Sequence, residues 1–333
     1  MTERRVAVVT GGTAGVGRAV VRELAGNGWD VAVLARGKAG LEGATDDASA
    51  LGARALGIET DVSDSGQVRS AAARVEEELG PIELWVNDAF AGDLRYFWDI
   101  PEDEFRKITD VTYLGQVHGT RVALEYMRPR DRGVIVQIGS ALAFRGIPLQ
   151  SAYCGAKHAI KGFTDSVITE LKHTGSAVRV SQVQLPGVNT AQFDWNATDF
   201  EDHPQPVEPI FQPEVAARAV RFLAENPRRN LWVGFSTAYT ILGSRLAPSF
   251  MDWYLARTVV DGQLSEDGGP RYGSNVFEPQ DDDVDHGAHG MFDDKAKNRD
   301  AWSWASMHRV ALAGAAAVVL AAAVVIPRAG RRG

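Results

Sequence analysis

Cysteine is almost absent from this sequence: Cys154 is the only one among 333 residues. A single cysteine excludes an internal disulfide and a metal site built from several thiolates. The seven histidines form no H-E-x-x-H pattern, and His286 and His289 lie in an acidic, glycine-rich stretch that is more typical of solvated chain than of metal ligands. We therefore expect no metal centre.

An excess of positive charge is also lacking. The formal net charge is −8 at pH 7, and no basic stripe carries interleaved aromatic residues, so nucleic acid is not an expected partner. Residues 2–5 are followed at once by a short apolar run, from which we expect no signal peptide. The folded part should therefore stay in a reducing cytosol.

Short apolar runs alternate with helical patterns along the first 184 residues. The expected strands are Val6–Thr10, Asp30–Leu34, Ala53–Ile58, Ile82–Val86, Gly133–Ile138 and Val178–Gln184. The expected helices are Arg18–Gly26, Gly40–Leu51, Gln67–Leu79, Glu102–Arg128 and Ala152–His173. Strands that alternate with helices of this length imply a parallel sheet covered on both faces. The predicted fold class is α/β, with a doubly wound parallel sheet.

The remaining third of the sequence is less regular. Thr190 to Pro213 has no periodicity, as in a flexible loop that covers a site, and Pro213–Asn226 is an expected helix. Asp, Gly and Pro are frequent over 261–300, which is typical of a mobile linker. We predict one domain over 1–260, an acidic linker over 261–305 and a C-terminal apolar helix over 306–333.

An unusual feature of the C-terminal part is the uncharged stretch Val310–Ile326, flanked by Arg309 and Arg328. Its seventeen residues fall short of the roughly 20 that usually span a bilayer, and many are alanine. It nevertheless has no polar face. We interpret it as a membrane anchor, a single C-terminal pass with the preceding domain in the cytoplasm. The alternative is a cytoplasmic protein whose tail packs in an oligomer.

A glycine-rich turn joins the first expected strand to the first expected helix. Its glycines permit a tight turn and a close approach of the backbone to a pyrophosphate, while the helix N-terminus offers unpaired N–H groups to the phosphates. The residues expected to bind a dinucleotide here are Gly11, Thr13, Gly15, Val16 and Gly17.

The residues after the next two strands bear on the choice of cofactor. A carboxylate at the end of the second strand would bind the ribose 2′-OH of NAD, but this sequence has Ala35 and then Arg36, which can pair with a 2′-phosphate. NADP is therefore the predicted cofactor, unless Arg36 is only a solvated loop residue. Asp61 and Val62 follow the third strand and either contact the adenine or, in the case of Asp61, cap a helix.

Tyr153 and Lys157 lie four residues apart on an expected helix, and therefore on one face of it. A nearby ammonium lowers the cost of ionising a phenol, which would make Tyr153 a proton donor and acceptor near neutral pH. The pair alone is a weak signal, because such spacing is common on helix surfaces. Ser140 lies thirteen residues before Tyr153 and strengthens it, although a serine there can simply cap a turn.

The order of T-G-G-T-A-G-V-G, T-D-V, V-N-D-A, a serine, Y-C-G-A-K and L-P-G resembles the short-chain dehydrogenase/reductase family, over about residues 4–235. The resemblance implies a single-domain Rossmann fold. It also implies that Tyr153 is the general acid/base, that Lys157 binds the nicotinamide ribose and lowers the tyrosine pKa, and that Ser140 holds the substrate oxygen. Asn87, Gly187 and Thr190 would add cofactor contacts.

Two positions depart from the family's pattern. Phe90 stands where the family often has a glycine, after Asn87-Asp88-Ala89. Thr112, in Val111-Thr112-Tyr113-Leu114-Gly115, replaces the asparagine that resembles a proton-relay element. A hydroxyl lacks the geometry of the amide, which puts the relay in doubt.

The combined prediction is an NADP-dependent oxidoreductase that interconverts a carbonyl and an alcohol. Aromatic residues after the sixth strand point to an apolar substrate, unless they belong to the core; they are Phe193, Trp195, Phe200, Phe211, Trp232 and Phe235. The alternative function is a non-catalytic NADP-binding redox sensor or membrane scaffold. The resemblance also implies a homodimer or homotetramer.

Overall fold

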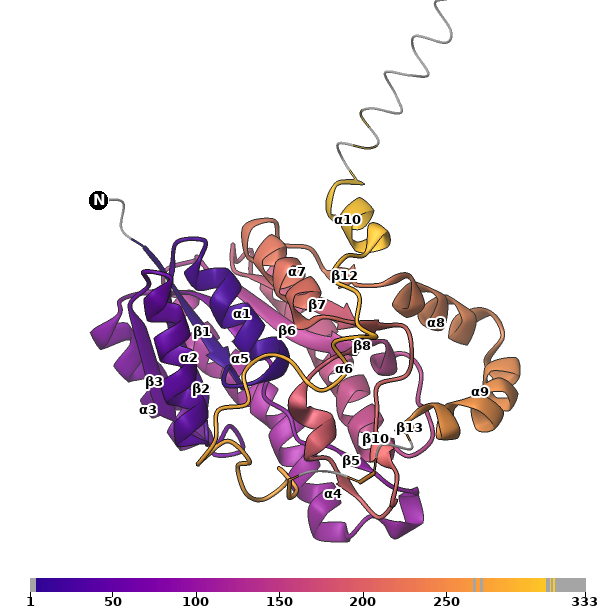
Figure 1. The fold of residues 1–333 in the computed structure, drawn as a ribbon. Helices are drawn as coiled ribbons and strands as arrows, with labels where there is room; N and C mark the ends of the chain where they lie inside the picture. Colours follow the sequence, from indigo (N-terminus) through magenta and orange to yellow (C-terminus); the bar gives the residue numbers. More distant parts are fainter. Residues whose placement is uncertain (1–3, 266–267, 270–271, 310–311, 313, 315–333) are drawn as a thin grey trace, which may run out of the picture.

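Seven parallel strands form the central sheet of the computed structural model, which describes residues 4–265, 268–269, 272–309, 312 and 314 (Figure 1). The strand order is β12-β7-β6-β4-β1-β2-β3. The strands are β1 (Arg5–Thr10), β2 (Trp29–Ala35), β3 (Ala55–Glu59), β4 (Ile82–Asn87), β6 (Val134–Ser140), β7 (Arg179–Leu185) and β12 (Asn230–Trp232). The order reverses at β1, which pairs with β2 on one side and β4 on the other.

Helices cover both faces of this sheet, and the alternation of side chains along β1 shows why. Ala7 and Val9 belong to one buried apolar cluster, while Val6 and Val8 belong to the other. The first cluster is closed by α1 (Gly15–Ala25), α2 (Lys38–Ala50) and α7 (Pro213–Glu225). The second is closed by α3 (Ser65–Glu78), α4 (Glu102–Thr109), α5 (Gly115–Met127) and α6 (Ser151–His173). The predicted doubly wound α/β fold is confirmed.

Two regions are more structured than the sequence pattern suggests. The helix expected over Glu102–Arg128 is divided by a π-helical turn, Asp110–Leu114, between α4 and α5. The loop Thr190–Pro213 contains β9 (Ala197–Thr198), β10 (His203–Pro204) and β11 (Ile210–Phe211). They pair respectively with β5 (Asp93–Leu94), β13 (Leu264–Ser265) and β8 (Gly187–Val188). Beyond them, α8 (Phe235–Leu246) and α9 (Pro248–Gly262) extend the chain.

The prediction of a mobile linker is wrong for residues 272–300. This segment runs back over the sheet domain, below α1 and α2 in Figure 1, before α10 (Ala301–Met307) begins. Val276, Ala288 and Phe292 are buried in it. Its composition misled because the partners that hold this segment, among them Arg18, Arg36 and backbone N–H groups of α2, lie far away in the sequence. The domain boundaries themselves stay a prediction.

The predicted membrane anchor is also wrong on the evidence of the described residues. Among the described residues, no helix is long and apolar enough to cross a bilayer. Most of the stretch 310–326 lies outside the described residues. The expected homodimer or homotetramer stays a prediction.

Candidate active site

A cavity of about 460 Å³ opens at the carboxyl ends of the strands, beside the point where the strand order reverses. Ligands of doubly wound sheets bind at this place. Most of the predicted site residues line the cavity: Gly11, Thr13, Gly15, Val16, Arg36, Asp61, Val62, Ser140, Tyr153, Lys157, Gly187 and Thr190. The fold therefore brings residues from both ends of the domain to one chamber.

The glycine-rich turn forms one wall, and its shape requires glycine. Gly11 and Gly15 have φ angles of +69° and +55°, a region that L side chains rarely adopt. A Cβ at Gly17 would overlap the carbonyl of Gly11, so Gly17 supports the turn from beneath without lining the cavity. The hydroxyl of Thr190 is buried with no hydrogen-bond partner among the described residues. A glycine-rich backbone turn and the unpaired hydroxyl of Thr190 fit a bound dinucleotide.

Tyr153 lies at the start of α6, with its hydroxyl hydrogen-bonded to Ser140 at the end of β6. Its ring contacts Phe90 edge-on, with 6.0 Å between the ring centroids. Burial raises the pKa of Tyr153, and the hydrogen bond to Ser140 opposes this effect only in part. The phenol of the ligand-free protein is thus held protonated, whereas the sequence suggested a lowered pKa.

Lys157 is buried one turn further along α6, and its ammonium lies 5.4 Å from the Tyr153 ring centroid. It donates a 2.7 Å hydrogen bond to the carbonyl of Ile138. Burial lowers the pKa of Lys157, and the carboxylate of Asp88 acts against this. Burial raises the pKa of Asp88, which Lys157 opposes in turn. The two groups therefore support each other's charge in a desolvated setting.

Thr112 and Asn87 do not line the cavity. The hydroxyl of Thr112 accepts from the backbone N–H of Ala91 at 3.0 Å and donates to the carbonyl of the same residue at 2.8 Å. Both capacities of the hydroxyl are used, so Thr112 braces the loop that carries Phe90. Asn87 is fully buried and bonds to Trp85, Thr120 and Gln137 inside the domain. Neither side chain is free to contact a ligand.

Replacing Thr112 by valine should destabilise the protein by about 2–6 kcal/mol. The shape is nearly conserved, but the buried N–H and carbonyl of Ala91 lose their partner, at about 1–3 kcal/mol for each unsatisfied group. Urea unfolding measures the change. Thr109→Val is the matched control, because the Thr109 hydroxyl only donates to the carbonyl of Phe105 in its own helix. Equal, small effects of both substitutions would contradict the bracing role.

Asp61 resolves the alternatives left open by the sequence. The N-cap of α3 is Asp64, which accepts from the N–H groups of Gly66 and Gln67. Asp61 instead lines the cavity and forms an ion pair with Lys107 at 2.8 Å. It is therefore placed at the cavity wall and does not cap the helix.

A sequence model described as "short chain dehydrogenase" matches residues 5–200. The chain belongs to this family. Among curated proteins it is similar to the uncharacterized oxidoreductase YxnA of Bacillus subtilis, with 28% identity over 279 residues, covering 82% of this chain and 78% of that protein.

Solved structures share the fold of this short-chain dehydrogenase/reductase. A family member from Burkholderia phymatum in complex with NAD has a TM-score of 0.66 at 23% identity, covering 76% of this chain and 97% of that one. An actinorhodin polyketide ketoreductase variant with NADPH has a TM-score of 0.63 at 25% identity, covering 70% and 97%. The protein is thus a short-chain dehydrogenase/reductase enzyme, and the neighbours bind either NAD or NADP.

Three functional candidates escaped the sequence analysis. Asp88, the charged partner of Lys157, stands in the V-N-D-A motif, where its type could have drawn attention. Gln116 donates to the carbonyl of Ile138 at 3.3 Å, beside the Lys157 bond, and its buried side-chain oxygen has no partner among the described residues. Asp93 lines the cavity with both carboxylate oxygens unpaired in that part of the chain. No local pattern distinguishes Gln116 or Asp93.

Proposed function

We propose that this enzyme interconverts a carbonyl and an alcohol with a nicotinamide dinucleotide, using Tyr153 as general acid/base. One observation carries the proposal: Ser140, Tyr153 and Lys157 line the same cavity as the glycine-rich turn. A dinucleotide held at the turn can extend towards the phenol within one chamber. When bound, it supplies or accepts the hydride.

At neutral pH the phenol of Tyr153 carries its proton, as a tyrosine of ordinary pKa, about 10, also does, and can donate it to a substrate oxygen. Burial raises this pKa further, so the ligand-free structure favours neither direction of the reaction. The hydroxyl of Ser140 already bonds to the phenol, so it lies within reach of the same substrate oxygen. Ser140 thereby orients the substrate oxygen towards Tyr153.

Lys157 would bind the cofactor and also stabilise the ionised form of the phenol. Its ammonium is held by the Ile138 carbonyl and retains two further N–H donors for a ribose hydroxyl. Its charge also favours the phenolate that remains after proton transfer. Asp88 helps to keep this lysine charged, because its carboxylate acts against the desolvation of the ammonium.

The preference between NAD and NADP has support on both sides. The end of β2 carries no carboxylate, and Arg36 lines the cavity, which supports the NADP predicted from the sequence. In the structure, however, the Arg36 guanidinium donates to the carbonyls of Phe277 and Asn275. The choice therefore depends on the C-terminal segment as well as on β2.

An apolar substrate body is supported by the apolar side chains that line the cavity. Phe193 and Trp195, two of the predicted aromatic residues, line it together with Met251 and Leu255 of α9. Asp93 is one of the polar residues of the chamber, and both of its carboxylate oxygens are without a hydrogen-bond partner among the described residues. We propose a mainly apolar carbonyl compound that carries a hydroxyl or other donor to meet Asp93.

A carbonyl screen tests the function. The full chain is mixed with NADH or NADPH and with aldehydes and ketones of increasing size, and oxidation is followed by nicotinamide absorbance. Turnover should appear and rise with the apolar size of the substrate. Saturable dinucleotide binding without turnover on any carbonyl, or on the matching alcohols with the oxidised cofactor, would instead indicate a non-catalytic redox sensor.

A further inference from the structure

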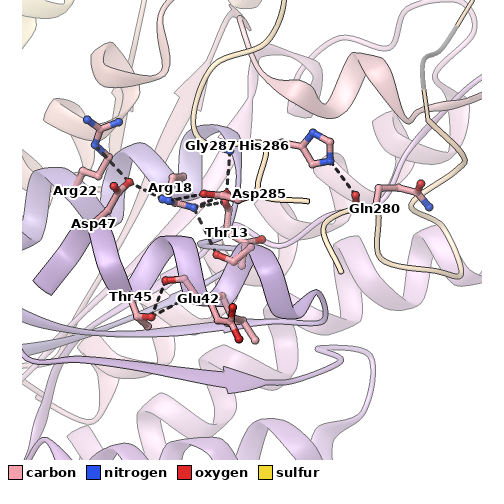
Figure 2. A network of polar contacts seen from close by, with 12 residues as sticks. Thr13, Arg18, Arg22, Glu42, Thr45, Asp47, Gln280, Asp285, His286 and Gly287 are labelled. Carbon is pink, nitrogen blue, oxygen red and sulfur yellow. Dashed lines mark hydrogen bonds and ion pairs between the residues drawn. The ribbon is translucent and has the colours of Figure 1, made fainter. Parts of the chain in front are cut away.

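Residues 275–293, which we name the acidic strap, cross the end of the cavity that the glycine turn and α2 form. Asp285 makes a two-bond ion pair with Arg18 of α1, at 2.9 and 3.0 Å (Figure 2). The carbonyl of Gly287 accepts from the N–H of Gly15 at 3.1 Å. The Arg18 side chain is only 3% exposed, whereas the Asp285 side chain is 35% exposed. The strap is thus fixed directly to the glycine-rich turn.

The strap also occupies the residue on which the NADP prediction rests. Arg36 donates to the carbonyl of Phe277 at 2.7 Å and to that of Asn275 at 2.5 Å. These carbonyls use the two terminal nitrogens of the guanidinium. Two of the five N–H donors of Arg36 are thereby used, and the strap fixes the orientation in which the others could meet a phosphate.

The first turn of α2 is occupied in the same way. The N–H of Lys38 donates to the Asp282 carboxylate at 3.1 Å, and that of Ala39 to the Asp282 carbonyl at 3.1 Å. The N–H of Gly40 donates to the carbonyl of Asp281 at 2.9 Å. These donors, at the positive end of the helix dipole, are the groups that would otherwise receive a phosphate.

The Asp281 carboxylate lies directly against the loop that follows β2. A Cβ built at Gly37 or Gly40 would overlap its oxygens, and the Cβ at Gly40 would also overlap Thr13 of the glycine turn. Asp281 lines the cavity. One turn further along α2, a Cβ at Gly43 would overlap the Asp285 carboxylate. The glycines at 37, 40 and 43 therefore open one face of α2 to the strap.

We propose that Asp281 supplies from the strap the carboxylate that β2 lacks, and that it makes the enzyme prefer NAD to NADP. In this fold an acidic side chain after the second strand accepts from the ribose 2′-OH of NAD and repels a 2′-phosphate. Asp281 meets Gly37, the residue after Arg36, and so reaches the same place from the far end of the chain. The inference rests on the proposed function and reverses the preference that Arg36 alone predicts.

Charge supports this assignment. A 2′-phosphate would bring close to two negative charges towards Asp281 and Asp282, while its natural counter-ion, Arg36, is held by the strap. A 2′-hydroxyl brings no charge and can donate to Asp281. The strap therefore discriminates between the two cofactors by repelling the 2′-phosphate of NADP as well as by binding the 2′-hydroxyl of NAD.

The test is a titration of the full chain and of Asp281→Asn with NADH and NADPH, read by fluorescence quenching of tryptophan; Trp195 lines the cavity. The wild type should bind NADH at least tenfold more tightly than NADPH. Asp281→Asn should tighten NADPH binding at least tenfold and weaken NADH binding a few-fold. Asp283→Asn is the control, because it removes the same charge from an exposed neighbour for which no hydrogen bond or ion pair is seen among the described residues.

The outcomes separate the two proposals. A wild type that prefers NADPH, or an Asp281→Asn preference equal to that of the wild type, overturns the role of the strap and leaves the oxidoreductase proposal intact. Equal shifts in the Asp281→Asn and Asp283→Asn variants also overturn it, since they reflect net charge alone. Binding of neither dinucleotide by any of the three proteins overturns both proposals.

Discussion

Replacing Tyr153 by phenylalanine should lower kcat about 10³-fold, while the dissociation constant of the dinucleotide changes less than about threefold. The first magnitude is that of a lost general acid. The second follows because the ring packing against Phe90 is kept and only the hydroxyl that bonds to Ser140 is removed. The measurement is steady-state turnover with the best carbonyl of the screen, beside a fluorescence titration of the same variant.

Tyr239→Phe is the matched control for this prediction. Tyr239 also lines the cavity, but it lies on α8 and is 45% exposed. Its hydroxyl has no role in the proposed proton transfer, so kcat should stay within a few-fold of wild type. Retention of more than a tenth of kcat by Tyr153→Phe would rule out the phenol as the proton donor.

Replacing Asp93 by asparagine should stabilise the protein at alkaline pH and have little effect at acid pH. Burial raises the pKa of Asp93 to about 7, from an unfolded value near 3.9. The folded state therefore holds a proton that the unfolded state releases, so wild-type stability falls as the pH rises from about 4 to about 7. One pKa unit corresponds to about 1.4 kcal/mol, which sets the expected loss at roughly 2–4 kcal/mol.

Urea unfolding of wild type and Asp93→Asn at pH 5 and pH 8 checks this expectation. The stability difference should grow in favour of the variant by about 2 kcal/mol or more between the two values. Asp99→Asn is the control, because it removes the same charge at an exposed position. A pH-independent difference for Asp93→Asn would show that its carboxylate is not desolvated in solution. Arg95 and Glu104 face Asp93 and stay unchanged in both variants.

The sheet and much of the site could be predicted because their signals are local. Val6 to Thr10 reads as a buried strand from its residue types alone, and the turn at Gly11–Gly17 follows it at once. Tyr153 and Lys157 share one helix, so their spacing fixes their relation whatever the rest of the chain does. The family resemblance then identified Ser140 at the end of another strand.

The parts that could not be predicted depend on contacts distant in sequence. Asp281 contacts Gly37, from which it is separated by almost the whole domain in sequence. The carbonyls of Asp281 and Asp282 accept from backbone N–H groups, which every residue type except proline provides. An Asp-, Gly- and Pro-rich stretch therefore looked like linker. Thr112 looked like an altered relay residue because its hydrogen bonds to Ala91 cannot be inferred from residue type.

The pKa of Tyr153 also differs between the sequence prediction and the structure. The sequence places Lys157 one helical turn away and suggests a lowered pKa, but burial dominates in the folded chain. Lys157 is directed to the Ile138 carbonyl, and desolvation lowers its pKa. The spacing of the two residues was informative, whereas their solvent exposure depends on the packing of the whole fold.

The most direct test of the central claim is an equilibrium titration of the full wild-type chain with NADH and NADPH, followed by energy transfer from tryptophan to the nicotinamide. We expect saturable binding of one dinucleotide per chain, with weaker binding after Gly17→Ala, because a Cβ there would overlap the carbonyl of Gly11 and the carboxylate of Asp88. The absence of saturable binding of both dinucleotides would contradict the account, since no hydride could then be exchanged in this cavity.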